Sequence, residues 1–449
     1  MGMGRDRGGY SYKLLSLRHD YRDKVGSHKA QGCAIMAADQ ETSFREAPMP
    51  STSSTDPIVI VGMARTPMGG FQGDLADATA PQLGSTAIRA ALERAGVAGA
   101  DVKEVLMGCV LPHGLKQAPA RQASRGAGIP DSAPCTTVNK MCGSGMKTVM
   151  QAYDGLLSGG LGDDGIAVAG GMESMTNVPY ILPKVRAGMR MGHGEVKDSM
   201  FYDGLENADD GRLMGSFAED TARELQFTRE VQDAYAIESL KRANKAISDG
   251  SFRSEIVPVT VKGRGGARVI DTDEQPGKAD VAKIPGLKPA FAANGTVTAA
   301  NSSSISDGAS ALVLMRQSTA EARGLKPLAR IVGHASHARA PEWFTTAPIG
   351  AIEELMKRTG WKIGDVDLFE INEAFAVVPL AAMRALDIPH AKVNVHGGAC
   401  ALGHPVGSSG SRIIITLLSA LQQYNKTRGV AALCIGGGEA TAVAIERLN

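Results

Sequence analysis

Two stretches of the sequence decide the fold: AIRAALERAGVAGADVKEV at residues 87–105 and AIEELMKRTGWKIGDVDLF at residues 351–369. They align without a gap at an offset of 264 residues (351 minus 87), with identical residues at Ala87/Ala351, Ile88/Ile352, Arg94/Arg358, Gly96/Gly360, Asp101/Asp365 and Val102/Val366. Each has the pattern of a helix that ends at a glycine, an Asp-initiated turn and a strand. A shorter pair, AGGMES at 169–174 and IGGGEA at 435–440, recurs at nearly the same offset. We therefore predict a duplicated α/β protein whose two related halves pack together.

The composition is that of a globular protein with unusually many glycines. Of 449 residues, 43% are hydrophobic, 21% are charged and 54 are glycine, about twelve in a hundred against a typical ~7%. Charge is balanced, with 48 Lys and Arg against 47 Asp and Glu, which argues against a nucleic-acid or anionic-membrane partner. No apolar run approaches the ~18–20 residues that a spanning helix needs.

The six cysteines form neither a disulfide framework nor a zinc-spaced cluster. We therefore expect free thiols and no metal site.

The ordered chain is expected to begin at the apolar run Ile58–Gly62, which is typical of a buried strand. Residues 1–56 are basic at first and then polar, and we expect a flexible N-terminal extension there. A transit peptide is the alternative for the basic segment. Residues 175–295 lack repeat pairing and contain one amphipathic helical pattern near 217–249, which indicates an insertion that could supply substrate contacts.

The first candidate for chemistry is Cys142, in Asn139-Lys140-Met141-Cys142-Gly143-Ser144-Gly145. A helical pattern follows, so the cysteine is expected at a helix N-terminus, where the helix dipole lowers the pKa of a thiol and favours the nucleophilic thiolate. The alternative is a small buried core cysteine.

The second candidate is His404, which lies in a Gly-rich segment at 397–410 before a strongly apolar helical stretch. An imidazole there could accept the proton of a thiol. A structural histidine or a phosphate-binding loop are the alternatives, although neither GxGxxG nor GxxxxGK[ST] occurs in this segment.

Two further segments complete the candidate site. Cys434 ends an apolar strand that runs into Gly436-Gly437-Gly438, whose backbone N–H groups could form an oxyanion hole. Taken alone, Cys434 could equally be a core residue. Asn372 and Glu373 follow the strand of the second repeat copy, where ligands bind in α/β proteins, although Asn372 could also be an ordinary helix N-cap.

Together these motifs closely resemble those of the thiolase family, and the resemblance covers residues 57–449. The matching pieces are NKMCGSG (139–145), GGMES (170–174), KPAF (288–291), GTVTAANSSSISDGA (295–309), NEAFA (372–376), GHPVGSSG (403–410) and CIGGG (434–438).

The resemblance implies the thiolase fold: two pseudo-symmetric βαβαβαββ halves stacked in five layers α-β-α-β-α, with an inserted loop domain over the coenzyme A site. On this basis we expect an N-terminal half at 57–171 plus 306–326, a loop domain at 172–305 and a C-terminal half at 327–449. A homo-oligomer, either a dimer or a tetramer, is implied as well.

The activity implied is that of an acyltransferase, an acetyl-CoA C-acetyltransferase of fatty acid metabolism. It joins two acetyl-CoA reversibly into acetoacetyl-CoA and CoA by a ping-pong mechanism through a cysteine acyl-thioester. By the same resemblance Cys142 is the nucleophile, His404 accepts its proton and Cys434 moves the α-proton of the second substrate. Asn372 holds a water that forms one oxyanion hole with His404, and the N–H groups of Cys142 and Gly436 form the other.

The acyl and coenzyme A contacts implied by the resemblance are Leu213, Met214, Lys278, Phe291, Ser303 and Phe375. Leu213 stands where acetoacetyl-CoA thiolases often have a histidine, and Lys278 stands near the position of an arginine expected at the coenzyme A phosphates. A degradative 3-ketoacyl-CoA thiolase of broader chain length is therefore the alternative, and a non-catalytic lipid-binding relative a remote one. Neither metal nor cofactor is implied. The cytoplasm is the expected location, with an organelle matrix as the alternative.

Overall fold

The computed structural model describes residues 56–263 and 265–448, so the extension expected at 1–56 lies, but for its last residue, outside the described part. The N-terminal half of the central sheet contains five long strands in the order β4-β3-β5-β10-β1. Their bounds are β1 Ile58–Arg65, β3 Glu104–Gly108, β4 Cys135–Val138, β5 Ile166–Ser174 and β10 Ser306–Arg316, and the short β2 (Gly69–Gly70) pairs with β10.

The C-terminal half repeats this order. Its strands run β12-β13-β14-β11, and Val393 extends the row by pairing with Phe369 of β12. Their bounds are β11 Ala329–Ala338, β12 Leu368–Ile371, β13 Arg428–Ile435 and β14 Glu439–Arg447. We number the strands of each half in chain order, leaving out the short β2 and taking Val393 as the third strand of the C-terminal half. Across the sheet both halves then have the strand order 3-2-4-5-1. The duplication predicted from the sequence is therefore confirmed in the topology.

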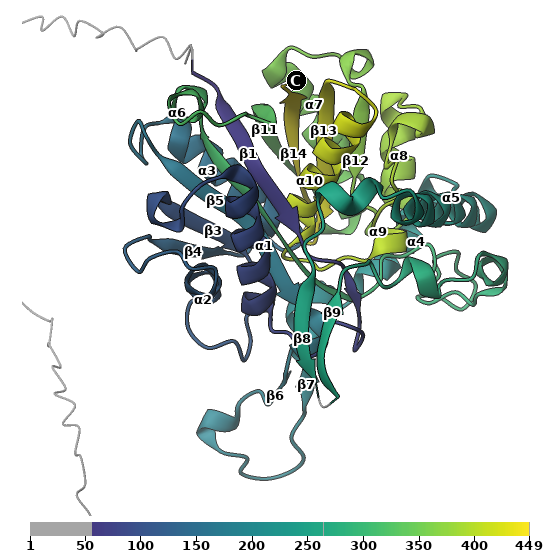
Figure 1. Ribbon diagram of the computed structural model, residues 1–449. Coiled ribbons are helices and arrows are strands. Elements are labelled where there is room, and N and C mark those ends of the chain that lie inside the picture. The colour runs from purple at the N-terminus through teal and green to yellow at the C-terminus, as the bar shows by residue number, and fades with distance from the viewer. Residues whose placement is uncertain (1–55, 264, 449) are drawn as a thin grey trace, which may run out of the picture. The chain divides into compact units, whose positions relative to one another are not determined.

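The two half-sheets join at their first strands, because β1 pairs antiparallel with β11 through Val59–Arg330 and Ile60–Ala329 (Figure 1). Both first strands also carry an irregularity at the same place, between Ile60 and Gly62 in β1 and between Ile331 and Gly333 in β11. The join is thus made by equivalent strands of the two halves.

Helices form three layers around the two half-sheets. The helices α1 (Ala80–Ala95) and α2 (Pro119–Gly126) cover the outer face of the N-terminal half, and α7 (Ala347–Thr359) and α8 (Val377–Leu386) cover that of the C-terminal half. Between the half-sheets lie α3 (Ser144–Leu157) and α10 (Ser409–Gln423), which contact strands of both. The five layers α-β-α-β-α expected from the sequence are therefore present.

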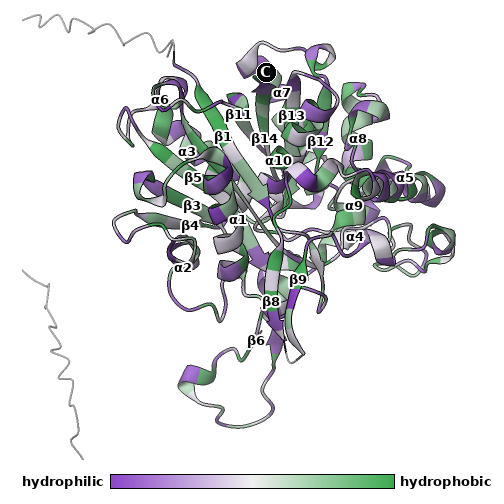
Figure 2. Cartoon of the chain, viewed as in Figure 1, coloured by the Kyte–Doolittle hydropathy of each residue, from purple (hydrophilic) through white to green (hydrophobic). Residues whose placement is uncertain are grey.

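The burial of each helix reflects its layer. The helix α10 lies between the two half-sheets and is buried from Ser409 to Leu421, including its charged residue Arg412, which lies 3.6 Å from a carboxylate oxygen of Glu370. The helix α1 buries one stripe, including Leu83 and Ile88, and exposes Arg89 and Glu93 on the other side. Figure 2 shows the same contrast, with hydrophobic strands inside and hydrophilic outer helix faces.

The inserted segment contains α4 (Met214–Glu224), α5 (Arg229–Ser248) and two hairpins, β6 (Tyr180–Ile181) with β7 (Lys197–Asp198) and β8 (Val259–Gly263) with β9 (Gly266–Ile270). The single helix predicted near 217–249 is wrong: it is two helices. Gln226 adopts a left-handed φ of 53°, and Thr228 caps α5 by accepting from the N–H of Val231. The expected start of the loop domain, after residue 171, lies inside β5. Its expected end, before residue 306, coincides with the start of β10.

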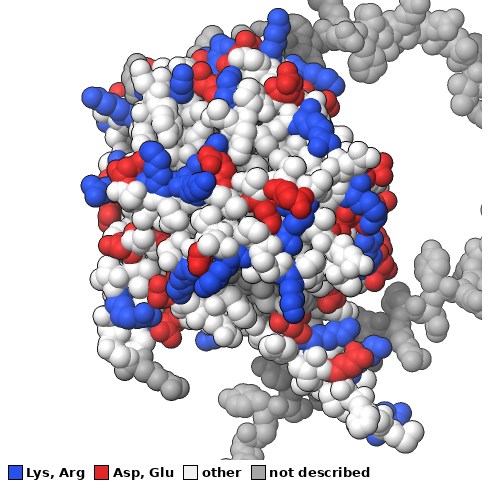
Figure 3. Space-filling view, turned by 90° about the vertical axis from the view of Figure 1, so that its right-hand side faces the viewer, with Lys and Arg blue, Asp and Glu red and all other residues white. Residues whose placement is uncertain are grey.

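The remaining short helices are α6 (Gln317–Ala322) and α9 (Ala399–Leu402). Within 56–263 and 265–448 no helix is both long and apolar enough to cross a bilayer. Acidic and basic side chains intermingle over the face drawn in Figure 3, as the balanced composition predicts.

The first turns of α3 and α10 touch backbone to backbone. A Cβ on Gly410 would lie 2.4 Å from the backbone N of Met146, and one on Gly145 would lie 2.7 Å from Oγ and 2.9 Å from N of Ser411. Real Cβ atoms do not come this close, so only glycine permits this approach. The segments that precede the two helices, which carry Cys142 and His404, are brought together as a result.

We expect Gly410→Ala to lower the free energy of unfolding by about 1–3 kcal/mol, because the added methyl must push α10 away from α3. The matched control is Gly155→Ala in α3, where a Cβ would meet nothing closer than 3.8 Å. That change should raise stability by about 0.5–1 kcal/mol, since alanine is the better helix former. Urea unfolding of both variants checks this, and equal effects would contradict the close-contact explanation.

Candidate active site

A cavity of about 380 Å³ opens where the two halves meet the inserted segment. Its lining is mostly apolar and includes eight residues predicted from the sequence: Cys142, Leu213, Met214, Phe291, Ser303, Phe375, His404 and Gly436. These come from both halves and from the insertion. The structure thus gathers residues that are as far as 294 positions apart in the sequence (436 minus 142).

Cys142 lies in a tight turn between β4 and α3. Met141 before it has a φ of 46°, and the N–H of Gly143 donates to the carbonyl of Lys140 (3.0 Å). Burial raises the pKa of the Cys142 thiol, while the N–H groups of Gly436 and of Cys142 itself act on it in the opposite direction. The predicted lowering of this pKa by the helix dipole is therefore wrong, because desolvation of the thiolate outweighs these donors.

The same two N–H donors form a candidate oxyanion site. The N–H groups of Cys142 and Gly436 both act on the sulfur of Cys142. One donor belongs to the N-terminal half and the other to the C-terminal half. A pair of backbone N–H groups in this position can stabilise an oxyanion.

His404 lies between α9 and α10 with its side chain buried. Its Nδ1 is 2.6 Å from Oγ of Ser409, and that hydroxyl donates to the carbonyl of Pro405 (3.1 Å). The Ser409 oxygen therefore accepts from Nδ1–H, which leaves Nε2 as the unprotonated nitrogen. Burial, helped by the charge of Arg412, lowers the pKa of His404 to about 3. The imidazole is thus a neutral base at physiological pH.

Cys434 and Asn372 are not among the residues that line the cavity. Cys434 is fully buried near the end of β13, and burial together with the neighbouring Cys142 thiol raises its pKa well above the usual value. Asn372 directly follows β12 and is 1% exposed, yet neither polar atom of its amide has a partner among the described residues. Asn372 is not a helix N-cap, because the next helix, α8, is preceded by Ala376. The Nε2 atom of His404 is likewise buried and unpartnered.

Two buried carboxylates, whose roles the sequence did not indicate, hold the loops of the site. Glu173 accepts from the N–H groups of Val110 (2.8 Å), Leu111 (3.2 Å) and Gly407 (2.9 Å). It thereby ties β5 to the loop of His404. Burial raises the pKa of Glu173 to about 7, although these hydrogen bonds oppose the shift.

The other carboxylate, Glu373, ties the insertion to the same loop. It accepts from the hydroxyls of Tyr235 (2.8 Å) and Ser239 (2.7 Å) on α5 and from the N–H of Cys400 (3.0 Å). The Asn394 amide also donates to it (2.8 Å). Glu373 was expected to face a ligand, but its donors are all within the protein. Nothing in the sequence pattern could have identified Tyr235 or Ser239 as its partners.

Three phenylalanines form one wall of the cavity. Phe375 packs edge-on against Phe291 and Phe344, with ring centroids 6.0 and 6.4 Å apart. Sequence reasoning found the first two but missed Phe344, which lies in the connection before α7 and carries no motif. The wall lines the same cavity as Cys142.

Lys278 is not among the residues that line this cavity. Its ammonium pairs with Glu274, whose carboxylate also accepts from the N–H groups of Gly70 and Asp74 (2.8 Å each). The hydrogen bond to Glu274 raises the pKa of Lys278. This lysine thus has a partner within the protein.

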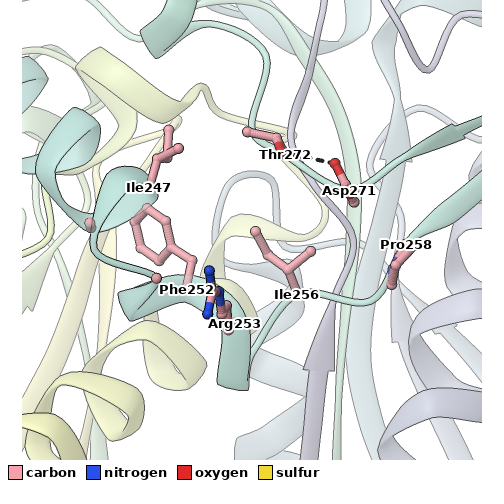
Figure 4. Close-up of a pocket in the computed structure, with 9 residues that line it drawn as sticks. Ile247, Phe252, Arg253, Ile256, Pro258, Asp271 and Thr272 are labelled. Atoms are coloured by element: carbon pink, nitrogen blue, oxygen red, sulfur yellow. Dashed lines mark hydrogen bonds between the residues drawn. The ribbon is translucent and has the colours of Figure 1, made fainter.

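A second cavity, of about 370 Å³, lies at the end of α5 (Figure 4). Phe252, Ile247 and Ile256 line it, and near them Thr272 donates to Asp271 (2.9 Å). None of the predicted site residues lines this cavity.

In the described part of the chain no group of three or more His, Cys, Asp or Glu residues is placed to hold a metal ion. The thiols are free at Cys109, Cys135, Cys142, Cys400 and Cys434.

The main cavity can therefore support acyl transfer. It combines a thiol, a neutral imidazole with a free Nε2 and two N–H donors that act on the sulfur of the thiol, and the second thiol, Cys434, neighbours Cys142. A nucleophile, a base and an oxyanion site are the requirements for forming and breaking an acyl thioester.

Comparison with known proteins gives the family context. Models of the N-terminal and C-terminal domains of thiolase match residues 58–318 and 325–447. Acetyl-CoA acetyltransferase 2 of Arabidopsis thaliana is 52% identical over 394 residues, which cover 87% of this chain and 97% of that protein. Acetyl-CoA acetyltransferase of Schizosaccharomyces pombe is 48% identical over 87% of this chain and 99% of that one. The crystal structure of the Bacillus anthracis acetyl-CoA acetyltransferase superposes on this chain with a TM-score of 0.85 at 38% sequence identity. The superposition covers 88% of this chain and 99% of that one.

The lowered pKa of His404 predicts a specific pH dependence of stability. An unfolded histidine binds a proton below pH about 6.5, whereas buried His404 stays neutral until about pH 3, so stability is lost as the pH falls through this window. Between pH 7.5 and 5.0 we expect His404 to account for about 2 kcal/mol of that loss. His404→Gln should lose correspondingly less free energy of unfolding over this range in urea titrations. An equal loss in wild type and variant would contradict the assignment of a neutral, buried imidazole.

Proposed function

This chain belongs to the thiolase family, and on that premise we propose that it is an acetyl-CoA C-acetyltransferase, which joins two acetyl-CoA reversibly into acetoacetyl-CoA and CoA. The observation that carries the proposal is the meeting of Cys142, His404 and the Gly436 N–H at one apolar cavity. Named relatives of 48% and 52% identity support the same activity.

In the first half-reaction Cys142 takes the acetyl group. Its thiol is neutral because burial raises its pKa, so the proton must leave as the sulfur attacks the thioester carbonyl. Nε2 of His404 accepts that proton, and the N–H groups of Cys142 and Gly436 stabilise the tetrahedral oxyanion. The C–S bond to coenzyme A breaks, the leaving CoA takes the proton of the Cys434 thiol, and Cys142 carries an acetyl thioester while His404 keeps the proton from Cys142.

In the second half-reaction a carbon–carbon bond forms. The Cys434 thiolate removes the α-proton of a second acetyl-CoA, and the enolate oxygen is stabilised by protonated His404 and by a water held on the amide of Asn372. The enolate carbon attacks the acetyl thioester, the Cys142–acetyl bond breaks, and acetoacetyl-CoA forms. The proton on His404 returns to the Cys142 sulfur, and Cys434 is a thiol again after taking the α-proton, so the enzyme is restored. The unpartnered amide of Asn372 and Nε2 of His404 support these roles.

This chemistry uses coenzyme A thioesters as substrates and requires neither a metal nor a redox cofactor. Leu213, Met214, Phe291, Ser303 and Phe375 line the acyl and pantetheine pocket in this proposal. The aromatic wall of Phe291, Phe344 and Phe375 favours short acyl chains over a broad chain-length range.

We further propose a homo-oligomer, either a dimer or a tetramer, in the cytoplasm. The hairpin of β6 and β7 projects from the folded part of the chain, at the lower end of Figure 1. Large apolar side chains on it are more than half exposed, namely Tyr180, Leu182, Met189, Met191 and Val196. Apolar clusters of this kind are typical of protein–protein contacts.

The proposed function is tested by CoA-dependent thiolysis of acetoacetyl-CoA beside 3-ketooctanoyl-CoA. We expect wild-type kcat/KM to be at least about tenfold higher for acetoacetyl-CoA, because the aromatic wall restricts the acyl group. Cys142→Ala should lose at least about a thousandfold in kcat on both substrates.

Equal or better turnover of the longer substrate would contradict the acetyltransferase assignment and favour the degradative thiolase. Absence of Cys142-dependent turnover of both substrates would contradict a catalytic function altogether.

A further inference from the structure

We propose that Lys140 and Glu439 form a positioning pair that sets the spacing of the two oxyanion-hole donors, the backbone N–H groups of Cys142 and Gly436. This inference rests on the proposed function. The Lys140 ammonium is paired with the Glu439 carboxylate across 299 residues of sequence. Lys140 precedes Cys142 by two residues, and Glu439 directly follows the Gly436–Gly438 turn. The pair therefore joins the two segments that each supply one donor.

The segment on the Lys140 side is held firmly by its own hydrogen bonds. Oγ of Ser144 accepts from the N–H of Lys140 (2.9 Å) and donates to the carbonyl of Met141 (2.6 Å). The N–H of Gly143 also donates to the carbonyl of Lys140 (3.0 Å). A displacement of Lys140 is thus passed on to Cys142.

The segment on the Glu439 side is held to the C-terminal half. Glu439 pairs with Ile435 across the β13–β14 turn and with Ala338 of β11. The carbonyl of Gly438 accepts from the N–H of Arg339 (2.8 Å). The three glycines themselves have no side chains that could contact the Cys142 segment, so Glu439 is the nearest following residue that can.

Two kinds of contact keep the segments together. A Cβ on Gly143 would lie 2.4 Å from Cδ1 of Ile435, so the two segments pack directly at this point. This apolar contact limits how closely they approach. The ion pair opposes their separation, and its side chains are only 25% and 38% exposed, which shields the attraction from full solvent screening.

The consequence for the reaction follows from the geometry of oxyanion stabilisation. Both N–H groups must point at one oxygen, and a displacement of 1 Å can cost about 10²-fold in rate. The loss of a partly exposed ion pair should cost only part of that factor in rate. We therefore expect the loss of either charge to lower kcat about three- to tenfold with little change in KM for CoA.

The experiment compares Lys140→Ala, Glu439→Ala, the double alanine variant and the charge-swapped Lys140→Glu/Glu439→Lys chain in acetoacetyl-CoA thiolysis. Both single variants should lose kcat, the double variant should lose no more than either single one, and the swap should recover at least half of the loss. The matched control is Arg323→Ala, which breaks a similarly exposed ion pair with Asp101 (2.8 Å; 33% and 38% exposed) away from the cavity. It should leave kcat unchanged.

The outcomes separate a positioning role from others. Unchanged kcat in either single variant, additive losses in the double alanine variant or no recovery in the swap would overturn the proposal, since Lys140 would then act alone or not at all. The double alanine variant decides the question even if the swapped chain fails to fold. Absence of thiolysis by the wild-type chain would contradict the proposed function, and this inference with it.

Discussion

The active site depends on the backbone contact between the first turns of α3 and α10 at Gly145 and Gly410. Each half-sheet buries one of its faces against these two helices, so apolar burial holds the central layer in place. Because the helices start at the same point, Cys142 before α3 and His404 before α10 reach one cavity. Each half supplies one part of the chemistry, and neither half contains a complete site.

Desolvation is the second constraint, and it determines the protonation states. It raises the pKa of both active-site thiols and lowers that of His404, so the resting site holds no thiolate and no imidazolium. Charge then develops only when a substrate is present, where the N–H groups of Cys142 and Gly436 and the amide of Asn372 can meet it. The buried carboxylates of Glu173 and Glu373 are held by donors of the protein and keep the surrounding loops in place.

The internal repeat predicted the duplicated topology because both copies preserve the same helix, turn and strand. The motifs predicted which residues meet at the cavity, since Cys142, His404 and Gly436 each lie in a recognisable glycine-containing motif. The break between α4 and α5 was missed because Gln226 gives no local signal for its left-handed conformation. Phe344, Ser409 and the partners of Glu373 were missed because their roles arise from contacts between distant segments. The direction of the Cys142 pKa shift was wrong because burial is a property of the tertiary structure.

The central claim is that Cys142 carries the acetyl group between the two substrates. Mass spectrometry of peptides after brief incubation with acetyl-CoA and acid quenching tests it most directly. The account predicts a gain of about 42 Da, one acetyl group, on the peptide that contains Cys142, and loss of that gain on addition of CoA. The gain should persist in Cys434→Ala, since Cys434 forms no bond to the acetyl group. An adduct on the Cys434 peptide instead, or none on either, would contradict the account.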